Sequence, residues 1–272
     1  MIGQKTILKL IEMQIAEGVF PRFLILVGPR GSGRTMLSKK IAEQMHANYL
    51  VLNDLKIDLV RECIQQAYKI MSKTVYVLNH ADEMSLNAKN ALLKVMEEPP
   101  NNAYFIMTLE DENNTLATIR SRGSVYKMEN YTKEELYDFM KRNTKLSHLD
   151  TTCLQACETP GDALLLESMD ADKFFAFVDK VIDNIATCSG SNAFKISKDI
   201  KFKDTDETGY DLFLFWKVFS LKCFNRYVTL GDRKYLTASS LTSDVIRTLR
   251  FKTVNRLMLF DKWILDIREA WM

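Results

Sequence analysis

The residues best suited to chemistry form one glycine-rich segment near the N-terminus. Its spacing is that of a phosphate-binding loop, G-x-x-x-x-G-K-[ST], except that an arginine stands in the lysine position. The backbone N–H groups of such a loop surround phosphate oxygens, and the helix that follows adds its positive N-terminus. Arginine keeps the charge but has a wider, planar head, so the two residues are not equivalent. The residues concerned are Gly28, Arg30, Gly31, Ser32, Gly33, Arg34 and Thr35.

The sequence on either side of this segment supports the same interpretation. A continuous apolar run, residues 22–28, precedes it, and a stretch with helical period, residues 34–45, follows it. A strand before and a helix after are the context that a phosphate loop requires. We therefore predict a phosphate-binding loop by descent. Whether it still holds ATP or ADP stays open, and the alternative is a glycine-rich turn with no ligand.

Hydrolysis of a nucleotide also requires acidic residues at the end of a second strand. They hold magnesium and orient the attacking water. After the apolar strand VYVL, the two expected acidic positions carry Asn79 and His80, and Asp82 and Glu83 lie further along. An amide binds magnesium weakly. His80 is either a base or simply a hydrogen-bonded histidine at a strand end. Since both halves of the site are altered, we predict weak or absent magnesium binding and loss of hydrolysis.

Apolar runs and helical periods alternate along the first half of the chain. Further strands are predicted at 48–54, 74–82, 103–109 and 124–128, with helices at 59–71 and after Ser85, which is suited to cap a helix. Strands that alternate with helices favour a parallel, doubly wound α/β sheet over residues 1–128.

The second half of the chain has mainly helical periods. Thr132 and Glu135 form a capping box that opens the first of these helices. Breaks are expected at 159–162, 188–192 and 203–211. The final apolar stretch, residues 244–271, predicts one helix or a pair, which forms either its own bundle or a face for partner subunits.

Composition limits the class of protein. The 272 residues carry a net charge of +2, so nucleic-acid binding would need a local basic patch. No signal peptide and no run of 18 apolar residues are apparent, which favours a cytoplasmic location. The five cysteines are scattered. Cys153 and Cys157, with His148 nearby, could suggest zinc, but no second pair completes the ligands, and reduced thiols are favoured.

One long segment resembles a known family. Residues 80–122, HADEMSLNAKNALLKVMEEPPNNAYFIMTLEDENNTLATIRSR, closely resemble the corresponding stretch of AAA+ clamp-loader subunits, with the bacterial DNA polymerase III gamma and delta-prime subunits as the nearest types. The resemblance covers residues 1–168. It implies a P-loop AAA+ core at 1–128, a helical lid at 129–168, and an all-helical collar at 169–272 that joins subunits into a ring. Such rings open a sliding clamp and place it on primed DNA.

The resemblance also assigns roles to single residues. The family's Ser-Arg-Cys motif corresponds to Ser121-Arg122-Gly123, so Arg122 is expected to act as an arginine finger in a neighbour's ATP site. By residue type alone, Arg122 would be a surface arginine in a salt bridge, as Arg120 would be. Thr108 ends its strand where a polar sensor stands. Lys89 is placed to contact DNA phosphates, or is a solvated lysine on an amphipathic helix.

Three departures from the family bear on activity. The lysine of the phosphate loop is replaced, the acidic pair is missing, and the lid motif at 161–164 lacks its sensor arginine. The zinc module of many delta-prime subunits is also missing, so no metal site is expected. The resemblance implies a delta-prime-like subunit that is deficient in its own hydrolysis. Its partners would be gamma/tau-like and delta-like subunits, the sliding clamp and primer-template DNA, with no membrane. The alternatives are an active gamma-like ATPase, or a non-hydrolysing scaffold in DNA repair or recombination.

Overall fold

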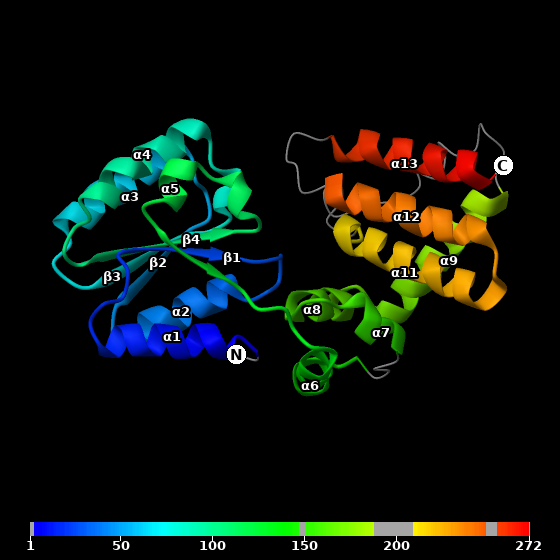
Figure 1. The fold of residues 1–272 in the computed structure, drawn as a ribbon, viewed down its shortest axis with the longest axis horizontal. Helices are drawn as coiled ribbons and strands as arrows, with labels where there is room; N and C mark the ends of the chain where they lie inside the picture. Colours follow the sequence, from blue (N-terminus) through cyan, green and yellow to red (C-terminus); the bar gives the residue numbers. More distant parts are fainter. Residues whose placement is uncertain (1–2, 147–150, 188–208, 249–254, 272) are drawn as a thin grey trace. The chain divides into compact units, whose positions relative to one another are not determined.

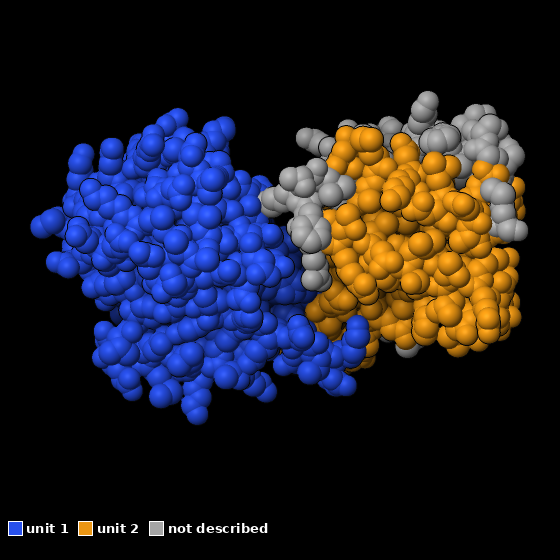
Figure 2. Space-filling view, turned by 45° about the horizontal axis from the view of Figure 1, so that its top comes forward, with its two compact units in different colours: residues 1–135, 159–161 blue, residues 136–158, 162–272 orange. Residues whose placement is uncertain are grey.

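The computed structural model describes residues 3–146, 151–187, 209–248 and 255–271. The chain divides into two compact units, coloured separately in Figure 2. Unit 1 comprises Met1–Glu135 and Thr159–Gly161, and unit 2 comprises Leu136–Glu158 and Asp162–Met272. The division into core, lid and collar at residues 128 and 168 stays a prediction, because the two units follow the packing of the chain and not the family's domain scheme.

Unit 1 is built on a parallel sheet, as the alternation of strands and helices predicted. The strand order is β2-β3-β4-β1-β5, and every neighbouring pair is parallel. All five residues of β1 and of β3 are buried, which is why these strands are continuous apolar runs with little polar alternation. The strands are β1 Phe23–Val27, β2 Asn48–Leu52, β3 Thr74–Leu78, β4 Ala103–Leu109 and β5 Ser124–Lys127.

Helices cover both faces of this sheet. Figure 1 shows α1 and α2 on one face and α3, α4 and α5 on the other. Alternate residues of β1 enter the two cores: Leu24 and Leu26 pack with α1 and α2, whereas Phe23, Ile25 and Val27 pack with the opposite helices. The helices are α1 Lys5–Ala16, α2 Arg34–Gln44, α3 Ile57–Lys69, α4 Leu86–Glu97 and α5 Ala117–Arg120, with short 3₁₀ turns η1 Ala81–Glu83 and η2 Glu112–Asn114.

Two helix starts predicted from sequence are confirmed. The Ser85 hydroxyl accepts from the Ala88 N–H at 3.2 Å and caps α4. At the start of α6, Lys133–Asn143, the Thr132 N–H donates to the Glu135 carboxylate at 3.1 Å, and the Glu135 N–H donates to the Thr132 hydroxyl at 3.2 Å. This is the reciprocal capping box.

Unit 2 is helical where it is described. The predicted final helical stretch, 244–271, contains the end of α12, Arg233–Thr248, and the whole of α13, Arg256–Trp271. The predicted breaks at 188–192 and most of 203–211 lie outside the described residues. The break predicted at 159–162 lies at 157–159, and α8 begins at Pro160. No helix in the described ranges is long and apolar enough to cross a membrane. Besides most of α6, unit 2 contains α7 Thr151–Ala156, α8 Pro160–Ser168, α9 Ala171–Thr187, α11 Leu212–Leu230, α12 Arg233–Thr248 and α13 Arg256–Trp271.

Aromatic side chains form the centre of unit 2. Trp263 on α13 packs edge-on against Phe219 of α11, with ring centroids 4.6 Å apart, and against Phe215 and Trp216. Its indole N–H donates to the buried Thr242 hydroxyl of α12 at 2.9 Å. One residue thus ties three helices together through packing and a satisfied polar group.

The cysteines that the structure describes are buried and form no disulfide, and burial raises the pKa of Cys63 and of Cys223 to about 12. A thiol reacts as its thiolate. Because pH 8 lies below the pKa of both thiols in the folded protein, both stay protonated at that pH. We therefore expect iodoacetamide to alkylate neither of them in the native protein. Peptide mass mapping before and after denaturation checks this. Labelling of either residue at a rate equal to that in the denatured chain contradicts it.

Candidate functional site

The glycine-rich segment lies between β1 and α2, at the carboxyl edge of the parallel sheet. Gly31 and Gly33 have φ of 78° and 88°, a region that residues with a side chain rarely adopt. A side chain at Gly28 would meet the Met128 side chain at 2.7 Å. The loop therefore requires its glycines for its own geometry, and the strand–loop–helix context predicted from sequence is present.

Arg34, the replacement for lysine, points into the protein. Its side chain is 6 % exposed, and Nη2 lies 3.9 Å from the Glu110 carboxylate, which follows β4. Burial lowers the pKa of Arg34, and the charges of Glu110 and Asp82 partly offset this effect. Nη1 is buried and makes no hydrogen bond among the described residues. At the site where lysine would reach a phosphate, the guanidinium therefore lies beside the Glu110 carboxylate of its own chain.

Asn79 links the phosphate loop to the neighbouring strand ends. Its carbonyl oxygen accepts from the Thr35 hydroxyl at 3.1 Å and from the Thr108 hydroxyl at 3.0 Å, and its amide donates to Asn53 at 3.0 Å. An amide oxygen has two lone pairs, and both are in use. Thr35, Asn79 and Thr108 thus lie together in a neutral hydrogen-bonded network, and the sensor role of Thr108 stays a prediction.

The nearest acidic residues serve other contacts. The buried Asp82 carboxylate accepts from the N–H groups of Glu110 and Asp111 and from the Asn114 side chain, at 2.9–3.4 Å. His80 is exposed, has a φ of 53°, and donates its backbone N–H to Thr108 at 3.0 Å. Its imidazole makes no hydrogen bond within the described ranges, so the structure gives it no partner for base catalysis. No cluster of three or more potential metal ligands occurs in the described part of the chain.

A turn from far along the sequence covers the loop at Gly31. The Gly31 carbonyl accepts from the Gly161 N–H at 3.1 Å, and the Arg30 carbonyl accepts from the Thr159 hydroxyl at 3.2 Å. A side chain at Gly31 would meet Gly161 Cα at 2.7 Å. Backbone thus packs directly on backbone here, and the turn that the sequence marked for its missing arginine closes one side of the loop.

Arg122, the predicted arginine finger, lies two residues beyond α5 and is partly exposed. It forms an ion pair with Glu97 at the end of α4, with Nη2 2.8 Å from the carboxylate. The Ser-Arg-Gly departure has a local reason, because a side chain at Gly123 would meet Ile25 Cδ1 at 2.8 Å. The role of Arg122 in a neighbouring site stays a prediction. The alternative of a surface salt bridge describes its contact within this chain.

Lys89, the predicted DNA contact, donates its ammonium to the backbone carbonyl of Asn114. Its side chain is therefore bound across to η2, and the proposed role on DNA stays a prediction. Asn53, which accepts from Asn79, and Glu110, which lies beside Arg34, were not predicted as site residues. A signal was available, since both directly follow strands whose carboxyl ends share one edge of the sheet.

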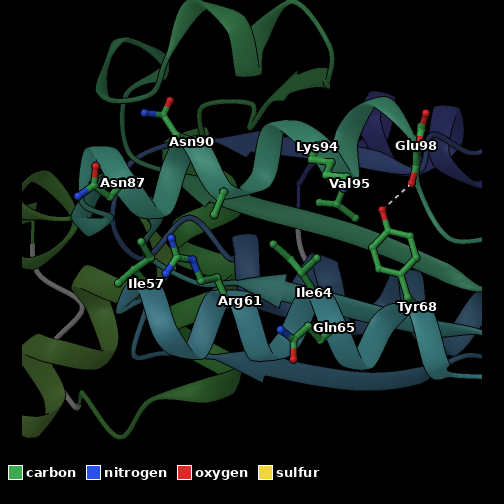
Figure 3. Close-up of a pocket in the computed structure, with 11 residues that line it drawn as sticks. Ile57, Arg61, Ile64, Gln65, Tyr68, Asn87, Asn90, Lys94, Val95 and Glu98 are labelled. Atoms are coloured by element: carbon green, nitrogen blue, oxygen red, sulfur yellow. Dashed lines mark hydrogen bonds between the residues drawn. The ribbon is translucent and has the colours of Figure 1, made fainter.

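A separate groove of about 1010 Å³ runs between α3 and α4 (Figure 3). Ile64 and Val95 contribute apolar surface, Arg61 and Lys94 contribute charge, and one end is crossed by the Tyr68 hydroxyl, which donates to the Glu98 carbonyl at 2.9 Å. None of the predicted site residues lines this groove. It is therefore a surface feature distinct from the phosphate loop.

The first half of the chain is similar in sequence to subunits of DNA polymerase III. Residues 35–132 match the family described as "DNA polymerase III, delta subunit". DNA polymerase III subunit gamma of Buchnera aphidicola (subsp. Schizaphis graminum) is 28% identical over an alignment of 174 residues, and the match covers 53% of this chain and 48% of the relative. Subunit delta-prime of Haemophilus influenzae is 30% identical over 120 residues, 43% and 36% of the two chains. The matches span about half or less of these relatives' length.

The structural similarity covers more of the chain than the sequence matches do. A DNA polymerase III gamma subunit-related protein of Thermotoga maritima superposes over 96% of this chain and 99% of its own, with a TM-score of 0.57 at 16% identity. At this identity the comparison concerns the fold only, which is the AAA+ P-loop fold with further helices. Sequence and fold together show that this chain is related to the clamp-loader-type AAA+ subunits of DNA polymerase III, the group that includes gamma, tau and delta-prime.

Proposed function

We propose that this chain is a delta-prime-like subunit of a replication clamp loader that does not hydrolyse ATP itself. In this proposal it assembles with gamma/tau-like and delta-like subunits, and the ring places a sliding clamp on primer-template DNA. Its contribution to chemistry is Arg122, which enters the ATP site of the adjacent subunit and neutralises charge on the transferred phosphoryl group. The relatives named above support the complex, and the altered loop supports the passive role.

The observation that carries the proposal is the network around Asn79. Magnesium prefers oxygen ligands arranged octahedrally and usually takes one or two carboxylates in nucleotide sites. At the strand end next to Thr35, this chain supplies an amide whose oxygen already accepts from the Thr35 and Thr108 hydroxyls. A neutral group with both lone pairs occupied is a poor magnesium ligand, and without the cation the charge of the outer phosphates is not neutralised for attack.

Two further contacts support loss of turnover. Arg34 lies beside Glu110 and not free in the loop, and the Thr159–Gly161 turn is hydrogen bonded to the loop backbone at Arg30 and Gly31. Binding of a magnesium–triphosphate complex is weakened by all three features of the site. The strand end lacks a carboxylate, Arg34 is directed toward Glu110, and the turn covers part of the loop. Each lies in the same site, so together they favour a subunit that acts through its neighbour.

An active gamma-like motor is the second candidate, favoured by the match to gamma subunits. It requires another carboxylate to hold the cation. Asp82 is the nearest in sequence, but three N–H-bearing groups already bind its carboxylate. A non-hydrolysing scaffold in DNA repair or recombination is the third. It would share the inactive loop, and only its partners would differ.

An ATPase assay of the isolated chain tests whether this subunit is passive. We expect no magnesium-dependent ATP turnover above a no-protein background, and no change on Thr35→Ala, because in this proposal the Thr35 hydroxyl donates to Asn79 and completes no cation site. Phosphate release at saturating magnesium–ATP measures this. Turnover that disappears on Thr35→Ala would reject the proposal in favour of the gamma-like motor. Co-purification with clamp-loader subunits from the source cells supports a loader, and capture of repair proteins alone supports the scaffold.

A further inference from the structure

Three hydrogen bonds fix the guanidinium of Arg122. Nε and Nη2 both donate to one carboxylate oxygen of Glu97, at 3.1 and 2.8 Å, and Nη1 donates to the Thr118 carbonyl at 3.1 Å. The acceptors come from different elements, the last residue of α4 and the interior of α5. Two anchors on separate elements define both the position and the plane of the group, which a single surface ion pair does not do.

The pattern leaves one part of the guanidinium available. Arginine has five N–H groups, one on Nε and two on each terminal nitrogen. The bonds to Glu97 and Thr118 use the Nε group and one on each terminal nitrogen. One N–H on Nη1 and one on Nη2 thus have no acceptor among the described residues. Paired N–H groups of this kind are what a phosphoryl group accepts from in bidentate form.

Glu97 lies at a position where an acidic side chain does not stabilise its own helix. It is the last residue of α4, where the negative end of the helix dipole disfavours a carboxylate, and Glu98 follows it directly. Both side chains of the pair with Arg122 are substantially exposed, 55% for Glu97 and 39% for Arg122. Exposed pairs contribute little to stability. Helix stability therefore does not account for a carboxylate at this position, whereas orientation of Arg122 does.

We propose that Glu97 is a positioning residue for the arginine finger. This inference rests on the proposed function, in which Arg122 acts on a neighbour's ATP. Glu97 holds the guanidinium by its Nε side, so that the remaining N–H groups are presented outward and little reorganisation is needed when the two subunits meet. Small displacements of a group that contacts the reacting atoms have large effects on rate. We expect a change at Glu97 to lower kcat of the neighbouring site, because in this proposal Glu97 does not itself contact the nucleotide.

The test compares variants in the assembled, DNA-stimulated complex. We expect Glu97→Ala to lower kcat for ATP about tenfold with little change in KM. Glu97→Gln should retain most of the activity, because its amide oxygen still accepts from Nε and Nη2. Glu98→Ala, adjacent and also exposed, should match the unchanged protein. In an Arg122→Ala background, Glu97→Ala should cause no further loss. The melting temperature of each variant chain should stay within about 1 °C of the parent, given the low worth of exposed pairs.

Different results separate the two proposals. If Arg122→Ala lowers turnover and Glu97→Ala leaves it unchanged or raises it, positioning by Glu97 is wrong and the finger stands. An equal loss for Glu97→Ala and Glu98→Ala also overturns positioning, since it would reflect a general effect on the end of α4. If Arg122→Ala itself leaves turnover unchanged, the proposed function fails, and the role of Glu97 fails with it.

Discussion

Replacing Arg122 with alanine should lower the DNA-stimulated ATP turnover of the assembled complex by about 10³-fold at the site that Arg122 enters, the lower end of the range for arginine fingers supplied in trans. The guanidinium neutralises charge that develops on the transferred phosphoryl group, and no other group of this chain is proposed for that position. Single-turnover hydrolysis by the complex, with only the adjacent ATP site competent, measures the effect.

The matched control is Arg120→Ala, at the last residue of α5 and two residues before Arg122. Arg120 donates to the Glu112 carbonyl at 3.3 Å and to the Asn113 side chain at 3.0 Å, so its contacts lie within its own chain. We expect near-parental turnover from that variant in a correctly assembled complex. Equal loss for both variants, or normal turnover with Arg122→Ala, would remove the basis for a finger at this position.

Trp263→Ala should lower the free energy of unfolding of unit 2 by about 3–5 kcal/mol, as expected for removal of a buried aromatic side chain. Trp263 is 1% exposed and contacts aromatic rings of α11, and its N–H binds Thr242. The truncation leaves a cavity and also removes the partner of a buried hydroxyl. Urea denaturation followed by far-ultraviolet circular dichroism measures the change.

Leu265→Ala is the control on the same helix. Leu265 is 39% exposed, and its truncation should change the free energy of unfolding by roughly 0.5 kcal/mol or less. Similar losses for Trp263→Ala and Leu265→Ala would mean that α13 does not pack on α11 and α12 through the tryptophan face.

Much of unit 1 is predictable from local pattern. The strand at 103–109 has the predicted bounds, and Ser85 caps its helix as predicted, because buried apolar runs and capping residues report on neighbours close in sequence. The prediction for 74–82 was too long: the strand ends at Leu78, and a 3₁₀ turn begins at Ala81. Asn79, which follows that strand directly, is instead turned toward the loop network.

The contacts that decide the chemistry are harder to predict, because they join distant segments. Asn53, Asn79 and Glu110 follow β2, β3 and β4, and they come together only because these strands are neighbours in the sheet. The motif spacing identified Thr35 and Asn79 as members of one site, but it could not show that each would satisfy the other. The ion pair between Glu97 and Arg122 likewise depends on how α4 and α5 pack side by side.

The contact between Gly31 and Gly161 has a consequence for any ligand. A phosphate group that approached Gly31 from that side would first have to displace the turn, so binding would require a less populated open form. The observed dissociation constant then rises in inverse proportion to the open fraction. Pro160 and Gly161 are also the first residues of α8, so a ligand that displaces the turn would also displace the start of that helix. Occupancy of the loop at Gly31 and the hydrogen bonds of the Thr159–Gly161 turn are therefore thermodynamically linked, and a change in either one shifts the other.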